Sequence, residues 1–130
     1  YHNVLASYLA REQANSQLVQ YLAYQAPTNS NIYFNFSSDP NNLEWLYGAS
    51  VHWRYVYDRP DLKPQLVGDA LPQNGYLLTW NFLAPHLTAS TPSATISYSI
   101  PQYQPILRQA LKTGLHLPPT TFIWQIERLK

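Results

Sequence analysis

The sequence of 130 residues has no cysteine, no methionine and only four glycines, all isolated. Without cysteine there is no disulfide, no thiolate metal site and no cysteine nucleophile. The glycines form neither a G-x-G-x-x-G sequence nor a phosphate-binding loop, so the common nucleotide-binding signatures are missing. Because an intact translation product begins with methionine, we expect a fragment or a processed chain of a longer protein.

Charge is also scarce. Charged residues make up 12% of the chain, against roughly 25% in typical soluble domains, and the net charge is +1. This balance gives no electrostatic reason to expect nucleic acid as a partner. No apolar run approaches the roughly 18 residues that a membrane-spanning helix needs. The length and the 45% apolar fraction predict one soluble domain over residues 1–130, with a sizeable core.

Hydrophobic periodicity predicts helices and strands in alternation. The expected helices cover residues 3–25, 40–58 and 101–111, and the expected strands cover 32–36, 63–69, 76–82, 95–100 and 122–129. Asn15-Ser16 is a possible second helix start, so the first helix is either one piece or two. Helices between strands favour a three-layer α/β sandwich with a mainly parallel, or mixed, sheet of four to five strands. The Asn74-Gly75 turn indicates one antiparallel pairing.

Motifs for catalysis are missing from the pattern. There is no G-x-S-x-G turn, and the four histidines show no H-x-x-x-H or H-E-x-x-H spacing. Asp58, Arg59 and Asp61 are better explained as a solvated ion-pair cluster at a helix end than as paired catalytic carboxylates. We therefore expect no catalytic residue, no metal and no cofactor in this chain.

A candidate binding rim lies at the carboxyl ends of the predicted strands, where ligands collect in open α/β sheets. The predicted binding residues are Asn35, Ser38, Asp39, Trp80 and Asn81, with Ser37, Asp69 and His86 nearby. Helix N–H groups after Pro40 point toward the same edge, and Trp80 offers a stacking face for a sugar. The competing interpretation is structural: Asp39 caps its helix, Asn35 closes a turn and Trp80 belongs to the core.

Aromatic residues are unusually frequent, at 15% of the chain with 11 Tyr and 4 Trp. Exposed Tyr and Trp suit a carbohydrate, a protein partner or the membrane–water interface. A Tyr-rich core explains many of them equally well, because Tyr8, Tyr21, Trp45 and Trp124 fall on apolar stripes.

The layout of the chain resembles a known family. A helix runs through "YLAYQAPTNSNIYFNF" into the first strand, a second helix runs into "RYVYDRPDL", and "FIWQIERL" forms the last strand. This is similar to the extracytoplasmic C-terminal domains of polytopic C-type membrane glycosyltransferases. The resemblance implies an accessory domain tethered by its parent chain on the extracytoplasmic (periplasmic or equivalent) side of a membrane. Its implied partners are a carbohydrate or acceptor polypeptide and the rest of the membrane-embedded parent.

The resemblance transfers no catalytic residue to any position. In that family the catalytic carboxylates lie in loops between the first membrane helices, and this sequence contains no such loop. We therefore expect a non-catalytic role in acceptor or sugar recognition. A free-standing ligand- or protein-binding module remains the alternative, followed by an independent small enzyme.

Overall fold

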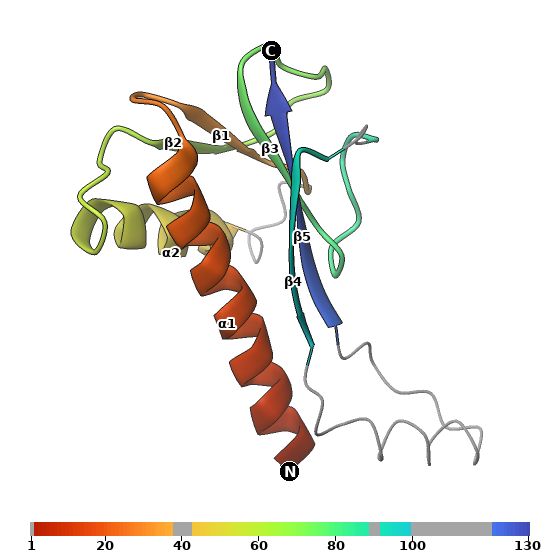
Figure 1. Ribbon diagram of the computed structural model, residues 1–130. Helices are drawn as coiled ribbons and strands as arrows, with labels where there is room; N and C mark the ends of the chain where they lie inside the picture. Colours follow the sequence, from red (N-terminus) through yellow and green to blue (C-terminus); the bar gives the residue numbers. More distant parts are fainter. Residues whose placement is uncertain (1, 38–42, 89–91, 100–120) are drawn as a thin grey trace.

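The computed structural model describes residues 2–37, 43–88, 92–99 and 121–130 (Figure 1). Within these ranges it contains two helices and five strands. They are α1 (His2–Gln25), β1 (Asn31–Phe34), α2 (Leu43–Tyr55), β2 (Lys63–Leu66), β3 (Gly75–Trp80), β4 (Ala94–Ser99) and β5 (Thr121–Leu129). Each corresponds to a predicted element. The predicted helix over 101–111 and the predicted helix start at Asp39-Pro40 lie outside the described residues.

One mixed sheet forms the centre of this α/β fold. The strand order is β2-β1-β3-β5-β4. Strand β1 runs parallel to both β2 and β3, whereas β5 runs antiparallel to both β3 and β4. The sheet is therefore parallel on one side and antiparallel on the other, which confirms the mixed form of the prediction rather than the mainly parallel form.

The Asn74-Gly75 turn does not create the antiparallel pairing that its sequence indicated. Strand β1 lies between β2 and β3, so the two strands on either side of this turn never pair with each other. Gly75 instead begins β3 with φ at 109°. A Cβ there would overlap the carbonyl oxygen of Asn31. The close approach of β3 to β1 therefore requires glycine at this position. The prediction that the strands before and after this turn pair with each other was wrong.

The main core lies between the sheet and the two helices. Strand residues with even numbers, including Phe34, Leu78 and Trp124, face Leu18 and Leu22 of α1 and Trp53 of α2. This alternation follows from the two-residue repeat of a strand. Among the described residues, α1 and α2 thus cover the same face. The third layer of the predicted sandwich stays a prediction, because the helix expected to form it lies outside the described ranges.

The opposite face of the sheet carries a smaller cluster. Val67, Leu77 and Leu129 are buried there, with Tyr33 and Leu87 packed against them. Val67 and Leu87 come from the segments that follow β2 and β3. Loops rather than the two described helices therefore contact this face.

Two indole groups fix α1 to the rest of the fold. The Nε1–H of Trp53 donates to the carbonyl oxygen of Val19 at 2.9 Å, and that of Trp124 donates to Asn15 Oδ1 at 2.9 Å. A buried indole N–H needs such an acceptor. Asn15 therefore binds the sheet from within one continuous helix, and the two-piece alternative for this segment was wrong.

The loop after α2 is held to the end of α1 by Arg59. Its guanidinium donates to the carbonyl oxygens of Ala23 and Pro27, at 2.6 and 3.1 Å, and forms a two-bond ion pair with Asp61. The hydrogen bonds from Arg59, followed by that from the Asn29 N–H, hold the pKa of Asp61 well below its usual range. The predicted ion pair forms between Arg59 and Asp61, and it is partly exposed: the exposed fractions of the two side chains are 19% and 21%.

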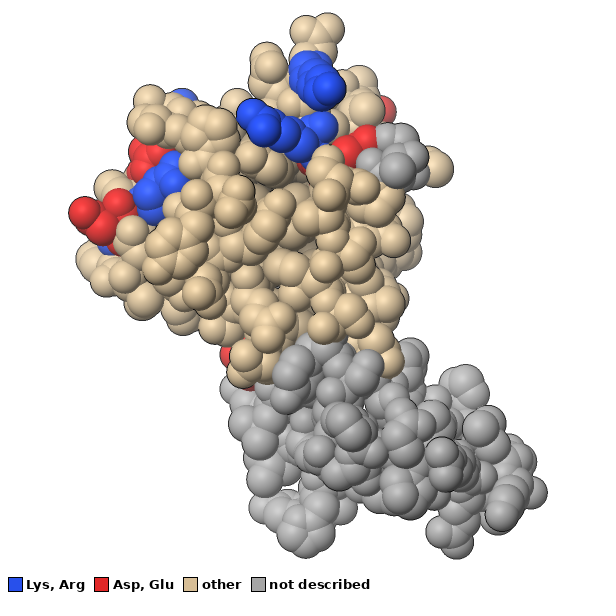
Figure 2. Space-filling model, viewed as in Figure 1, with Lys and Arg blue, Asp and Glu red and all other residues tan. Residues whose placement is uncertain are grey.

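Charged side chains are sparse on the surface. Figure 2 shows that most of the visible surface of the described residues carries neither acidic nor basic groups, and that the charged groups gather in small clusters of both signs. Within the described ranges, neither helix combines the length and the apolar character required to cross a bilayer.

Candidate functional site

Asn35, the first residue of the predicted strand-end rim, holds the fold together through its side-chain amide. Asn35 follows β1 and is 0% exposed. Its Nδ2 donates to the carbonyl oxygen of Leu87 at 2.8 Å and to Thr79 Oγ1 at 3.1 Å. Its Oδ1 accepts the backbone N–H of Leu87 at 2.8 Å. Asn35 therefore fastens the loop after β3 to the sheet, and its amide is covered by protein.

Trp80 lies inside an aromatic cluster rather than on the surface. It is 2% exposed, and its ring centroid lies 4.5 Å from that of Trp124 and 5.9 Å from that of Phe122. Phe82 packs beside it, 5.5 Å away. A sugar-stacking tryptophan must have one ring face open to the ligand, whereas the Trp80 ring is enclosed by neighbouring aromatic side chains. The structural interpretation therefore describes Trp80 better.

The remaining rim residues divide into two groups. Asn81 is exposed, but its amide bonds the backbone of Thr121 and Ile123 at 3.0 and 2.9 Å, which anchors the start of β5. Asp69 and His86, which follow β2 and β3, meet at 3.0 Å on the surface. Ser38 and Asp39 lie outside the described residues, and no ligand is present to test the rim as a binding site.

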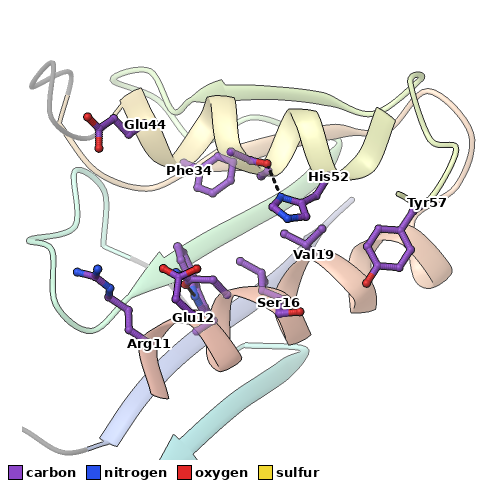
Figure 3. Close-up of a pocket in the computed structure, with 13 residues that line it drawn as sticks. Arg11, Glu12, Ser16, Val19, Phe34, Glu44, His52 and Tyr57 are labelled. Atoms are coloured by element: carbon purple, nitrogen blue, oxygen red, sulfur yellow. Dashed lines mark hydrogen bonds between the residues drawn. The ribbon is translucent and has the colours of Figure 1, made fainter. Parts of the chain in front are cut away.

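A cleft lies between α1 and α2 (Figure 3). Its volume is about 480 Å³, within the roughly 300–1,000 Å³ range of small-molecule sites. The lining comes from both helices, from the sheet and from the loop after α2. It comprises Arg11, Glu12, Asn15, Ser16, Leu18, Val19, Phe34, Glu44, Gly48, Ala49, His52, Tyr57 and Trp124.

The cleft has an apolar base and a polar wall. Leu18, Val19 and Ala49 are buried, and Phe34 and Trp124 are each 1% exposed, so these side chains close the bottom without offering a ring face. The accessible lining is more apolar than polar, and its polar part is supplied by side chains of α1, of α2 and of the loop after α2, above the base. This division is typical of sites that exclude water below a ligand and orient the ligand through hydrogen bonds.

The polar wall is itself ordered. His52 Nδ1 lies 2.8 Å from the carbonyl oxygen of Gly48, one helical turn earlier. Because a carbonyl oxygen only accepts, Nδ1 carries the proton, and in the neutral imidazole Nε2 is then an acceptor. Tyr57 packs edge-on against Tyr24, with ring centroids 6.0 Å apart. Figure 3 shows Arg11 and Glu44 toward one end of the cleft and Tyr57 toward the other.

The cleft combines charged side chains with neutral hydrogen-bonding groups. Nowhere in the described ranges do three His, Asp or Glu side chains come close enough to hold a metal ion. The cleft contains two carboxylates, on Glu12 and Glu44, from different helices. The polar atoms of the wall can donate and accept several hydrogen bonds to one small ligand.

The residues of the cleft carry only weak signals in the sequence. Arg11, Glu12 and Asn15 interrupt the apolar stripe of α1, and Gly48 and His52 lie beside the apolar stripe of α2. A polar interruption on one helix and a glycine on another are weak signals in isolation. Only the packing of the two helices places them on one cavity.

Comparison of the chain with protein-family models, with curated proteins and with solved structures finds no match.

Proposed function

We propose that this chain is a non-catalytic accessory domain, on the extracytoplasmic side of a membrane, of a glycosyltransferase-like parent protein. In this role it contributes to recognition of the acceptor or the sugar. The single observation that carries the proposal is the cleft between α1 and α2, which joins an apolar base to an ordered polar wall. The order of helices and strands, on which the family resemblance is based, also supports the proposal.

Location is the first testable part of the proposal. The chain has no cysteine, so one introduced thiol reports its own accessibility. We expect Gln73→Cys, at an exposed position, to react with a membrane-impermeant maleimide added outside intact cells that express the full-length protein. Ala14→Cys is the matched control, because the side chain of Ala14 is 0% exposed and a thiol there should react only after unfolding. Labelling of Gln73→Cys only after membrane permeabilisation would contradict the proposed location.

Enzyme assays test whether catalysis belongs to the parent protein and not to this chain. Membranes containing the full-length protein should transfer a sugar from a polyprenyl-phosphate donor, whereas the isolated chain should turn over no ester, phosphate or glycoside substrate. Turnover by the isolated chain that disappears in a Ser or Asp variant would overturn the non-catalytic role. Absence of transfer by the full-length protein would overturn the glycosyltransferase-like parent.

A free-standing ligand- or protein-binding module is the second candidate. The observation that favours it is an exposed stripe on α2, where Tyr47, Val51 and Tyr55 are 67%, 53% and 75% exposed at intervals of four residues. Tyr is frequent at the energetic centres of protein interfaces. This candidate is favoured if the full-length product transfers no sugar while Tyr47→Ser and Tyr55→Ser weaken its binding to polypeptides.

A further inference from the structure

The cleft between α1 and α2 is mixed in charge. Its described lining holds one guanidinium, on Arg11, and two carboxylates, on Glu12 and Glu44. A phosphate or a carboxylate ligand would therefore meet more negative than positive charge. A cationic ligand would meet Arg11, which Figure 3 shows toward the same end of the cleft as Glu44. A neutral ligand avoids both conflicts.

The rest of the wall suits hydroxyl groups. Ser16 and Tyr57 carry hydroxyl groups that both donate and accept hydrogen bonds, whereas Asn15 Oδ1 already accepts the indole N–H of Trp124. His52 presents Nε2 as the acceptor, because its Nδ1 is held by the carbonyl oxygen of Gly48. Such an alternation of donors and acceptors matches a ring that carries several hydroxyls, each of which donates one bond and accepts others.

Gly48 keeps space open at the cleft. It lines the cavity from α2, and a Cβ placed there would meet no heavy atom within 4 Å. Glycine in the interior of a helix is unfavourable relative to alanine, so neither the helix nor local packing explains this residue. A Cβ at this position would stand in open space beside the cleft.

We propose that this cleft is the binding site for one neutral, polyhydroxylated ring of monosaccharide size. The ring lies on the apolar base, with its hydroxyls bonded to the wall around His52 and Tyr57. This inference rests on the proposed function and deepens it, because it names the site and the ligand class through which the domain recognises a sugar. The site differs from the strand-end rim that the sequence indicated.

The test is an NMR titration of the 130-residue chain with glucose, mannose, galactose and N-acetylglucosamine. Glucuronate and glucosamine serve as the anionic and cationic counterparts. We expect at least one neutral sugar to shift the amide signals of Ser16, Gly48 and His52 in a saturable way. Neither charged sugar should bind more tightly than the neutral sugars.

Two glycine variants decide whether the cleft is the site. Gly48→Gln places a side chain in the cavity, and we expect it to weaken binding at least about tenfold, or about 1.4 kcal/mol. Gly68→Gln is the matched control: Gly68 is also exposed, its Cβ would also meet nothing within 4 Å, and it does not line the cleft. Gly68→Gln should bind like the unaltered chain. Unfolding curves of both variants confirm that each is folded.

Several results would overturn the inference. They are shifts confined to the strand-end rim around Asn81 and His86, unchanged affinity in Gly48→Gln, tighter binding of a charged sugar, or no saturable shift with any neutral sugar. These results are separable from failure of the proposed function. If the chain binds a sugar in the cleft but the full-length protein transfers none, the site stands and the parent assignment falls. If the full-length protein transfers sugar but the cleft binds none, the parent assignment stands and the proposed sugar site falls.

Discussion

Two polar regions of this domain use the same kinds of side chain in opposite ways. At the strand-end rim, the side-chain amides of Asn35 and Asn81 form hydrogen bonds with backbone groups of loops and strands. In the cleft between α1 and α2, Glu12, Ser16 and His52 are exposed on a cavity. The two rim asparagines thus hold the fold together, whereas the cleft retains polar groups that face solvent.

This difference determines whether a ligand would have to replace hydrogen bonds within the protein or only bound water. A ligand at the rim would have to replace protein hydrogen bonds that are already made at 2.8–3.1 Å around a buried amide. Replacing such a bond gains nothing and leaves a buried partner unpaired, at a cost of about 1–3 kcal/mol. In the cleft a ligand replaces water. Three substitutions test this contrast between the two regions, in order of decreasing effect on the free energy of unfolding.

Trp80→Ala should give the largest effect. Trp80 is 2% exposed and contacts the rings of Trp124, Phe122 and Phe82. Removing the indole leaves a large cavity, and we expect a loss of about 3–5 kcal/mol in the free energy of unfolding. Urea denaturation followed by circular dichroism measures it. Phe82→Ala, at a residue 37% exposed, is the control and should lose much less.

A different result at Trp80 would restore the rim as a sugar site. If Trp80→Ala loses less than about 1 kcal/mol, far below the loss for a buried aromatic, and sugar binding disappears, the indole is a ligand platform and not part of the core.

Asn35→Ala should give the second effect. The substitution leaves the N–H and carbonyl oxygen of Leu87 without their side-chain partner in a buried setting. We expect a loss of about 2–3 kcal/mol, because each orphaned buried group carries its own desolvation cost. Asn81→Ala is the matched control at an exposed amide, where water can replace the lost bonds. Equal losses at the two positions would mean that Asn35 is not as enclosed as its contacts indicate.

Much of the architecture was predictable from local pattern. The helix 3–25 and the strands around Ile32 and Tyr76 follow from periodicity, because an apolar repeat of 3.6 or 2 residues reports directly which face is buried. The order in which the strands pair in the sheet was harder to predict from the sequence. The Asn74-Gly75 turn has hairpin sequence, yet β1 separates the two neighbouring strands, and this depends on contacts between residues far apart in the chain.

The sequence could not show which polar side chains are already bonded within the fold. Asn35 and Trp80 looked available because sequence shows residue type and strand position but not the partner. The partner of Asn35 is Leu87, 52 residues away, and that of Asn15 is Trp124, 109 residues away. Polar side chains in the cleft became recognisable only when α1 and α2 were packed on one face of the sheet.

Gly48→Ala should change the free energy of unfolding least. The direction of this change is more informative than its size. Gly48 lies inside α2, its backbone is not in the left-handed region, and a Cβ there meets nothing within 4 Å. Alanine should therefore raise the free energy of unfolding by about 0.5–1 kcal/mol through the lower entropy of the unfolded chain. Urea denaturation measures the change, and the small methyl group should leave sugar binding nearly intact.

Gly75→Ala is the matched contrast, because that glycine serves the fold. Its φ of 109° and the overlap of a Cβ with the carbonyl oxygen of Asn31 require a shift of the backbone. We expect a loss of more than about 1 kcal/mol. A gain at position 48 beside a loss at position 75 would show that the fold tolerates a side chain at the cleft, where space is kept for a ligand. Destabilisation by Gly48→Ala would mean that α2 is packed closely at this point, and the cleft would then be too narrow for a sugar ring.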